Sequence, residues 1–141
     1  MPSPCSQLYV HLVWTTWERL PLITPAVELV LCAALAAKCA ELGAQCLAVG
    51  AVADHVHVLV RCHPSATVSE LVGQMKGSSS HLINHEIPES GSFRWQAAHG
   101  AFSVSPAGVE RVRRYIVNQK QHHREGSISP DVEQWDRRSP D

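Results

Sequence analysis

The chain has 141 residues, of which 45% are hydrophobic and 18% are charged, and its formal net charge is -1. This length fits one domain with a buried core, which argues against a disordered chain and leaves no room for a nucleotide-binding domain beside a substrate domain. The near-neutral total conceals a segregation of charge, because residues 61–124 carry eight basic and four acidic groups between net acidic flanks, so a local basic surface is compatible with the composition.

Two elements are predicted in the first third of the chain. Residues 7–14 are rich in β-formers and predict a strand. Thr24 and Pro25 form an N-cap followed by a proline in the first helical turn, and the alanine- and leucine-rich run over residues 26–42 predicts a helix. Gly43 stands where a glycine commonly ends a helix.

The middle of the chain predicts a strand pair and a second helix. Residues 45–52 and 55–61 are β-branched runs separated by two residues, which indicates an antiparallel pair. A helix follows from residue 68 to about residue 84. Gly73, Gly77 and the three serines after Gly77 weaken this helix and favour a kink or break within it.

The last elements complete a recognisable order. A short strand is predicted over residues 101–105 and a helix from residue 109 to about residue 122. The first six elements then follow the ferredoxin-like β-α-β-β-α-β order, an α+β fold with an antiparallel sheet and helices on one face. We expect one domain over residues 1–124, with an appended C-terminal helix that carries Tyr115, and an acidic, polar and loose tail over residues 125–141.

Sequence features also favour a cytoplasmic protein with no membrane partner and no nucleotide cofactor. No run approaches the ~20 apolar residues that span a bilayer, and the N-terminus lacks the basic flank and apolar core of a signal peptide. The cysteines are odd in number and contain no CxxC pair, which is typical of buried thiols in a reducing compartment.

The run Asp54-His-Val-His-Val-Leu-Val60 holds the first candidate site. Because side chains alternate across a strand, His55 and His57 share one face, ~6.5–7 Å apart along it, while the intervening valines face a core. Each imidazole needs a polar partner, and a shared metal ion would satisfy both. The spacing alone leaves a second interpretation equally open, namely two partly exposed histidines on an uncovered sheet face.

The final helix holds the second candidate site. Tyr115 and Gln119 are four residues apart and therefore neighbours on one helical face. The apolar stripe of Val109, Val112 and Ile116 would dock the helix on the sheet and leave the tyrosine at the edge of the contact. A tyrosine on a basic helix is more often structural than catalytic, and this alternative also stays open.

Several short motifs together carry a resemblance to a known family. In chain order they are His11-Leu-Val-Trp-Thr-Thr16, Asp54-His-Val-His-Val-Leu-Val60, Lys76-Gly-Ser-Ser79, Trp95-Gln96, Gly100-Ala-Phe-Ser-Val-Ser105, Tyr115-Ile-Val-Asn-Gln119 and His122-His123-Arg124. Over residues 7–124 this ordered set resembles the single-tyrosine HUH transposases. These are the small transposases of hairpin-ended bacterial and archaeal insertion sequences, and they include the repeat-associated tyrosine transposases.

The resemblance implies a ferredoxin-like homodimer that acts on hairpin-containing single-stranded DNA. It assigns His55, His57 and Gln119 to a divalent metal, Mg²⁺ or Mn²⁺, and Tyr115 to the nucleophile that joins the 5′ phosphate and frees a 3′ hydroxyl. The residue types suit this chemistry. A cation neutralises charge on the phosphate oxygens, and tyrosine keeps the DNA end as a covalent intermediate.

Basic side chains complete the expected DNA contacts, and three alternatives remain. The expected contacts are Lys76, Arg94, Arg111, Arg114, Lys120 and Arg124. The alternatives are a domesticated relative that binds or processes genomic repeat hairpins, a non-catalytic nucleic-acid-binding module of the same fold, and a small zinc protein. The zinc site of that last alternative would use His55, His57, Cys62 and His63.

Overall fold

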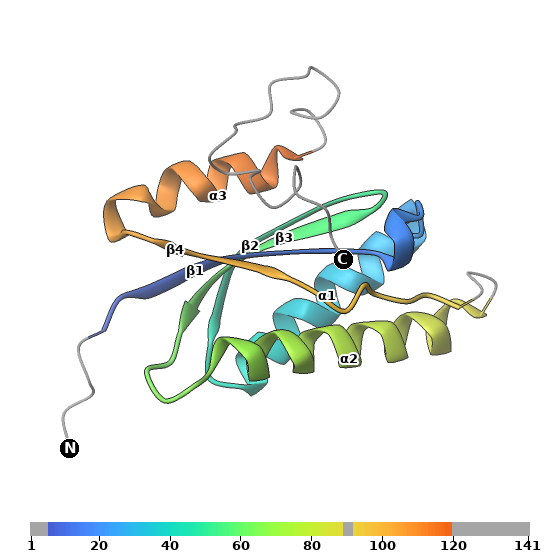
Figure 1. Cartoon of the computed structure of the whole chain (residues 1–141), viewed down its shortest axis with the longest axis horizontal. Helices are drawn as coiled ribbons and strands as arrows, with labels where there is room; N and C mark the ends of the chain where they lie inside the picture. Colours follow the sequence, from blue (N-terminus) through green and yellow to red (C-terminus); the bar gives the residue numbers. More distant parts are fainter. Residues whose placement is uncertain (1–5, 89–91, 120–141) are drawn as a thin grey trace.

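The fold is an α+β sandwich built on one antiparallel sheet (Figure 1). The computed structural model describes residues 6–88 and 92–119. The strands are β1 (Leu8–Thr15), β2 (Gln45–Val52), β3 (His55–Cys62) and β4 (Gly100–Val104), and the helices are α1 (Pro25–Glu41), α2 (Val68–Glu86) and α3 (Val109–Val117). Two short 3₁₀ turns, η1 (Trp17–Arg19) and η3 (Pro106–Gly108), precede α1 and α3. The strand order β2-β3-β1-β4 confirms the predicted ferredoxin-like fold.

The main core lies between the sheet and the first two helices. Figure 1 shows α1 and α2 on one face of the sheet and α3 on the other. Alternate residues of the two central strands are fully buried against α1 and α2, among them Leu12, Trp14, Val56, Val58 and Val60. The prediction that the valines of β3 face a core is therefore confirmed, and the odd-numbered residues of β3 point toward α3.

Local signals in α1 act as predicted. The Thr24 hydroxyl accepts a hydrogen bond from the backbone N–H of Val27 at 3.3 Å, and Pro25 occupies the first turn. Beyond the helix, Gly43 has a φ of 75°, a left-handed conformation that glycine adopts without strain.

The second helix is unbroken, so the predicted kink or break is wrong. Thr67 caps its start by accepting from the N–H of Glu70, and the helix continues through Gly73 and Gly77. One face of α2 buries Leu71, Val72, Met75, Ser79 and Ile83. Packing of this face against α1 and the sheet outweighs the weak local propensity, as tertiary contacts usually do. No helix in the two described stretches has both the length and the hydropathy needed to cross a membrane.

The third helix packs on the sheet through a small apolar cluster and one glycine. The cluster consists of Ala48, Leu59, Val112 and Ile116. At Gly50, opposite His57 on β2, an added Cβ would lie 2.0 Å from the carbonyl oxygen of Ile116. A side chain there would therefore collide with helix backbone, so the glycine permits the close approach of α3 that covers the histidine strand.

The end of α3 lies close to the limit of the described residues. Helix α3 spans Val109–Val117, Asn118 adopts a turn conformation, and Gln119 is helical again. The predicted extension to residue 122, the domain boundary at residue 124 and the acidic tail over 125–141 lie outside the described residues.

Candidate active site

The two histidines of β3 are enclosed between the sheet and α3. His57 is 0% exposed and His55 is 2% exposed. Their ring centroids lie 5.1 Å apart with the planes at 71°. In the strand register His57 pairs with Val13 of β1 and Gly50 of β2. The interpretation of two partly exposed histidines on an uncovered sheet face is therefore wrong, because α3 covers this face of the sheet.

Tyr115, on α3, and Gln119, just after α3, reach the same enclosed space from the helix side. The Tyr115 ring is 7% exposed, and its centroid lies 6.4 Å from that of His57. The Gln119 side chain is 1% exposed, and its amide nitrogen lies 3.4 Å from Nε2 of His55. The structure thus brings together all four residues that the sequence had singled out, from one strand and from the end of one helix.

A third histidine, whose role the sequence did not reveal, holds His57. Nε2 of His11 lies 2.8 Å from Nδ1 of His57, and the two rings stack with centroids 5.0 Å apart. His11 is 3% exposed on β1, where it pairs with Leu59, two residues beyond His57. Diagonal neighbours on one sheet face contact each other, so the strand register was the signal that could have identified His11.

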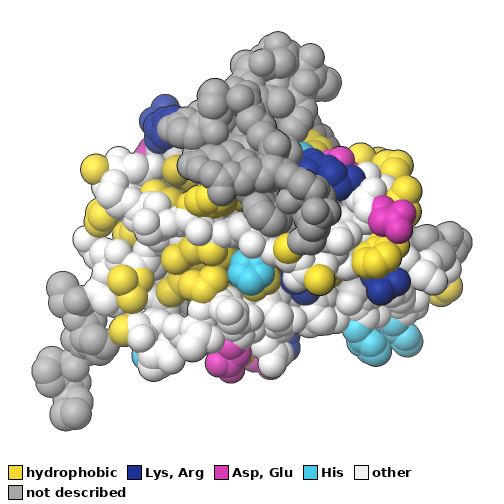
Figure 2. Space-filling view, in the orientation of Figure 1, with side chains coloured by type: hydrophobic (Ala, Val, Ile, Leu, Met, Phe, Trp, Pro, Cys, Tyr) yellow, Lys and Arg dark blue, Asp and Glu magenta, His cyan; other side chains and the backbone are white. Residues whose placement is uncertain are grey.

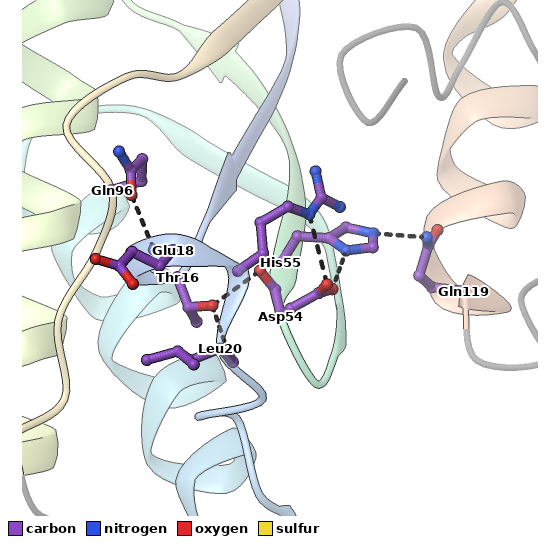
Figure 3. Close-up of polar contacts among 8 residues, drawn as sticks. Thr16, Glu18, Leu20, Asp54, His55, Gln96 and Gln119 are labelled. Atoms are coloured by element: carbon purple, nitrogen blue, oxygen red, sulfur yellow. Dashed lines mark hydrogen bonds and ion pairs between the residues drawn. The ribbon is translucent and has the colours of Figure 1, made fainter. Parts of the chain in front are cut away.

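An acidic side chain holds His55 in the same manner. Oδ1 of Asp54 lies 2.8 Å from Nδ1 of His55, and Asp54 also forms an ion pair with Arg19 at 3.5 Å. The hydrogen bond with His55, together with the charges of His55 and Arg19, lowers the pKa of Asp54 below its ordinary value in spite of burial. An ionised carboxylate can only accept, so it favours the form of His55 that carries its proton on Nδ1. Figure 3 shows Asp54, His55 and Gln119 in succession.

The contacts at Nδ1 of His55 and His57 decide which nitrogen of each ring is left to bind a divalent metal. Both Nδ1 atoms contact other protein groups, so Nε2 is the atom of each imidazole with which a metal would have to be bound. Metal-binding histidines commonly hydrogen-bond through their other nitrogen to a carboxylate or similar group. The amide of Gln119 supplies an oxygen donor, since its oxygen and nitrogen are interchangeable by a flip. Two nitrogens and one oxygen fit Mg²⁺ or Mn²⁺ with positions left open for phosphate and water.

The zinc alternative does not fit the structure. Cys62 ends β3, and its side chain packs against the core on the α1 and α2 side, away from His55 and His57. Across the described ranges, no group of three or more His, Cys, Asp or Glu side chains is arranged to hold a metal. Cys62 lies on the opposite face of the sheet from the histidine pair, and His63 lies beyond the end of β3. A zinc site that joins these two residues to His55 and His57 is therefore excluded.

The predicted DNA contacts divide into structural and exposed side chains. Lys76 is half-buried, which lowers its pKa, and its ammonium donates to the carbonyls of Gln96, Ala97 and Ala98 at 2.6–3.2 Å. It holds the segment before β4, a structural role that the sequence did not indicate. The guanidinium of Arg94 stacks 3.9 Å from the centroid of Trp17 and stays exposed.

The basic residues of α3 lie on its outer surface. Arg111 and Arg114 are exposed, and Arg111 lines a cavity of about 230 Å³ together with His11. Arg113 forms a bidentate ion pair with Glu110, which lowers the pKa of that carboxyl. Lys120 and Arg124 lie outside the described residues. Figure 2 shows the Lys and Arg side chains of the face in view dispersed and not gathered in one patch.

Comparison with known proteins assigns the family. The family model described as "Transposase IS200 like" matches residues 4–119, which include all four strands, α3 and the clustered site residues. The chain therefore belongs to the IS200-like transposase family. No curated protein sequence matches the chain significantly.

Two solved structures resemble the fold. A candidate transposase from Deinococcus radiodurans R1 superposes with a TM-score of 0.68 at 23% identity, over 84% of this chain and 95% of that one. A REP-associated tyrosine transposase bound to a REP hairpin superposes with a TM-score of 0.62 at 14% identity, over 87% of this chain and 72% of that one. At these identities the likeness establishes a shared fold.

Proposed function

We propose that this transposase cleaves and rejoins hairpin-containing single-stranded DNA, with Tyr115 as nucleophile and a divalent metal at His55, His57 and Gln119. The observation that carries the proposal is the meeting of the four side chains in one enclosed cluster beneath α3. Membership of the transposase family supports strand cleavage and transfer as the reaction. The cluster has both a nucleophile and a set of metal donors, which a purely structural contact between helix and sheet does not need.

The proposed reaction starts with attack by the Tyr115 oxygen on a DNA phosphorus. The bond between phosphorus and the 3′ oxygen breaks, the leaving oxygen gains a proton to become a 3′ hydroxyl, and the 5′ phosphate stays on the tyrosine. When bound, the metal would neutralise charge on the non-bridging oxygens and orient the phosphate. Tyrosine must lose its proton to attack, since its ordinary pKa is about 10. Attack of a 3′ hydroxyl on the phosphotyrosine reverses these steps and rejoins strands without ATP.

Hairpin DNA is the proposed substrate, and a homodimer is the proposed assembly. The solved relative bound to a REP hairpin supports the first part. The second part rests on the family resemblance. In the described chain α3 packs against its own sheet, at Gly50 and at the cluster around Leu59. This packing supports a site completed within one chain.

The decisive experiment is covalent capture. The full-length protein is incubated with a labelled single-stranded hairpin oligonucleotide and Mg²⁺ or Mn²⁺, then denatured and separated on a gel. A labelled band at the mass of protein plus DNA is expected only when metal is present. Absence of that band over a panel of hairpins, with binding intact, would favour a non-catalytic nucleic-acid-binding module.

A second candidate function shares this site. The relative bound to a REP hairpin favours a domesticated enzyme that processes hairpins repeated in a host genome. The two functions differ in the position of their substrates. Hairpins that flank the gene would indicate a mobile element, whereas matching hairpins scattered through the genome would indicate a domesticated enzyme.

A further inference from the structure

The turn after β1 has an unusual backbone. Glu18 has a φ of 51° and Arg19 a φ of 54°, and these are the non-glycine residues with positive φ in the described part of the chain. Left-handed backbone is disfavoured for residues with a Cβ, and such conformations persist where the surroundings fix them. Two consecutive residues of this kind beside a candidate active site therefore call for a physical reason.

The surroundings fix this turn from two sides. The Thr16 N–H donates to the carbonyl of Asp54 at 2.9 Å, and the Thr16 hydroxyl lies between the carbonyls of Leu20 and Asp54, at 2.5 and 3.2 Å. On the other side, the Trp17 N–H donates to the carbonyl of Arg94, and the Glu18 N–H donates to the side-chain oxygen of Gln96 at 3.0 Å. Figure 3 shows the contacts of Thr16 with Asp54 and of Glu18 with Gln96 at this turn. The backbone around Arg19 is thus held with respect to Asp54.

The side chain of Arg19 extends this arrangement into the site. Its Nε lies 3.5 Å from Oδ2 of Asp54, while Oδ1 of the same carboxylate lies 2.8 Å from Nδ1 of His55. Each carboxylate oxygen therefore has a separate partner. On the far side of the imidazole, Nε2 of His55 faces the Gln119 amide at 3.4 Å. The guanidinium, the carboxylate, the imidazole and the amide form one continuous chain.

We propose that Arg19 is a positioning residue, which acts through Asp54 to keep the His55 proton on Nδ1 and its Nε2 lone pair directed at the metal position beside Gln119. A carboxylate that rotates freely could turn away from the imidazole, and the proton could then move to Nε2, the nitrogen that must coordinate. Arg19 restrains that rotation by binding the second oxygen. The metal part of this inference rests on the proposed function, whereas the position of the proton does not.

The test measures the imidazole directly in metal-free, full-length protein. Two-bond ¹H–¹⁵N spectra, recorded at alkaline pH, distinguish the two neutral forms of each histidine. The wild type should hold His55 in the Nδ1-protonated form. In Arg19→Gln both forms should appear, and Mn²⁺ binding, measured by calorimetry, should weaken by about tenfold. Arg61→Gln, which removes an exposed arginine at the opposite end of β3, is the matched control and should change neither quantity.

Two further variants keep the test decisive. Arg19→Lys retains the charge with one point of contact and should restore most of the single form and of the Mn²⁺ affinity, and it decides the matter if Arg19→Gln does not fold. Asp54→Asn should mix the two forms more strongly than Arg19→Gln. An Arg19→Gln protein with the wild-type histidine spectrum and the wild-type Mn²⁺ affinity would overturn the inference. A wild type that binds no Mn²⁺ would instead refute the proposed metal site, and the spectra would still decide the role of Arg19.

Discussion

His55 and His57 are held at Nδ1 by different groups, a carboxylate for His55 and a second imidazole for His57. Asp54 accepts from the first at 2.8 Å, and His11 lies at the same distance from the second. Because Nδ1 of each ring is engaged, Nε2 is the remaining ring nitrogen of both histidines, an arrangement that suits a shared ion.

Tyr115→Phe should abolish the covalent protein–DNA band and spare hairpin binding. The change removes one oxygen and keeps the ring that packs 6.4 Å from His57, so stability should fall by no more than the ~0.5–1.5 kcal/mol of an ordinary hydrogen bond. The measurements are adduct formation, hairpin affinity and urea unfolding on the same sample. A covalent band from Tyr115→Phe would show that another side chain is the nucleophile.

His57→Ala should remove the stabilisation by metal. For the wild type, Mn²⁺ at 100 times its Kd should raise the free energy of unfolding by about 2.7 kcal/mol, and the variant should show no such increment. The increment is the right measure because the variant also leaves His11 without its 2.8 Å contact, which by itself costs about 1–3 kcal/mol.

A second pair of histidines, on α2, must be removed before the Mn²⁺ titration can be interpreted. His81 and His85 are exposed on α2, with their rings parallel and 6.4 Å apart, and could bind transition metals on their own. Urea unfolding with and without Mn²⁺ is therefore compared in proteins that carry His81→Gln and His85→Gln. A full metal increment in His57→Ala on this background would contradict the metal-site assignment.

At the scale of elements, α3 decides whether the site exists, and its contact with the sheet is narrow. Four buried apolar residues and the close approach at Gly50 hold it in place. A helix held by so small a cluster belongs to the less stable part of a fold. We therefore expect substitutions under α3 to separate Tyr115 and Gln119 from the histidines while leaving the main core intact.

Gly50→Ala tests that dependence. The added Cβ would lie 2.0 Å from the Ile116 carbonyl oxygen, so α3 must shift, with an expected destabilisation of about 1–3 kcal/mol and loss of the metal increment. Gly73→Ala is the matched control, because nothing lies within 4 Å of its added Cβ, and in a helix it should stabilise by about 0.5–1 kcal/mol. Urea unfolding and Mn²⁺ titration distinguish the two. Unchanged stability and metal binding in Gly50→Ala would show that α3 docks differently.

The elements were predictable from the sequence to the extent that local signals matched tertiary packing. The proline after Thr24 and the β-branched runs on either side of Asp54 placed α1, β2 and β3 correctly. The continuity of α2 was not predictable, because the burial of Ser79 and Met75 that stabilises it depends on distant partners. The role of His11 was not predictable for the same reason, although the residue stands in a family motif. Its contact with His57 follows from strand pairing, which a single sequence does not specify.

At the scale of the whole molecule, a near-neutral chain must still attract a polyanion. Exposed arginines lie on α3, the helix that covers the site, so DNA affinity should fall as salt rises. Arg114→Gln should reduce the salt slope by roughly 0.7 for single-stranded DNA if Arg114 contacts one phosphate. Arg61→Gln, at the opposite end of β3, should leave the slope unchanged. Fluorescence anisotropy over a salt series provides the measurement, and equal slopes for wild type and Arg114→Gln would remove Arg114 from the interface.

The packing of α3 on its own sheet leads to a prediction for mixed dimers. If Tyr115 acts within its own chain, a mixture of Tyr115→Phe and His57→Ala proteins contains no complete site and should give no covalent band. If α3 instead completes the partner's site, mixed dimers contain one intact site and the band returns. The distances from Tyr115 to His57 and from Gln119 to His55 favour the first outcome. Recovery of the band would show an exchange of α3 between chains.

The order of the site residues along the chain has a consequence for synthesis on the ribosome. His11, Asp54 and the histidine pair are made early, whereas Tyr115 and Gln119 come near the end of the described chain. At a translation rate of about 5–20 residues per second, the interval between His57 and Gln119 is about 3–12 s. At the start of that interval β1 and β2, with β3 up to His57, have been made, whereas β4 and Tyr115 have not. Under the proposed function, a nascent chain therefore cannot cleave DNA until α3 has left the exit tunnel.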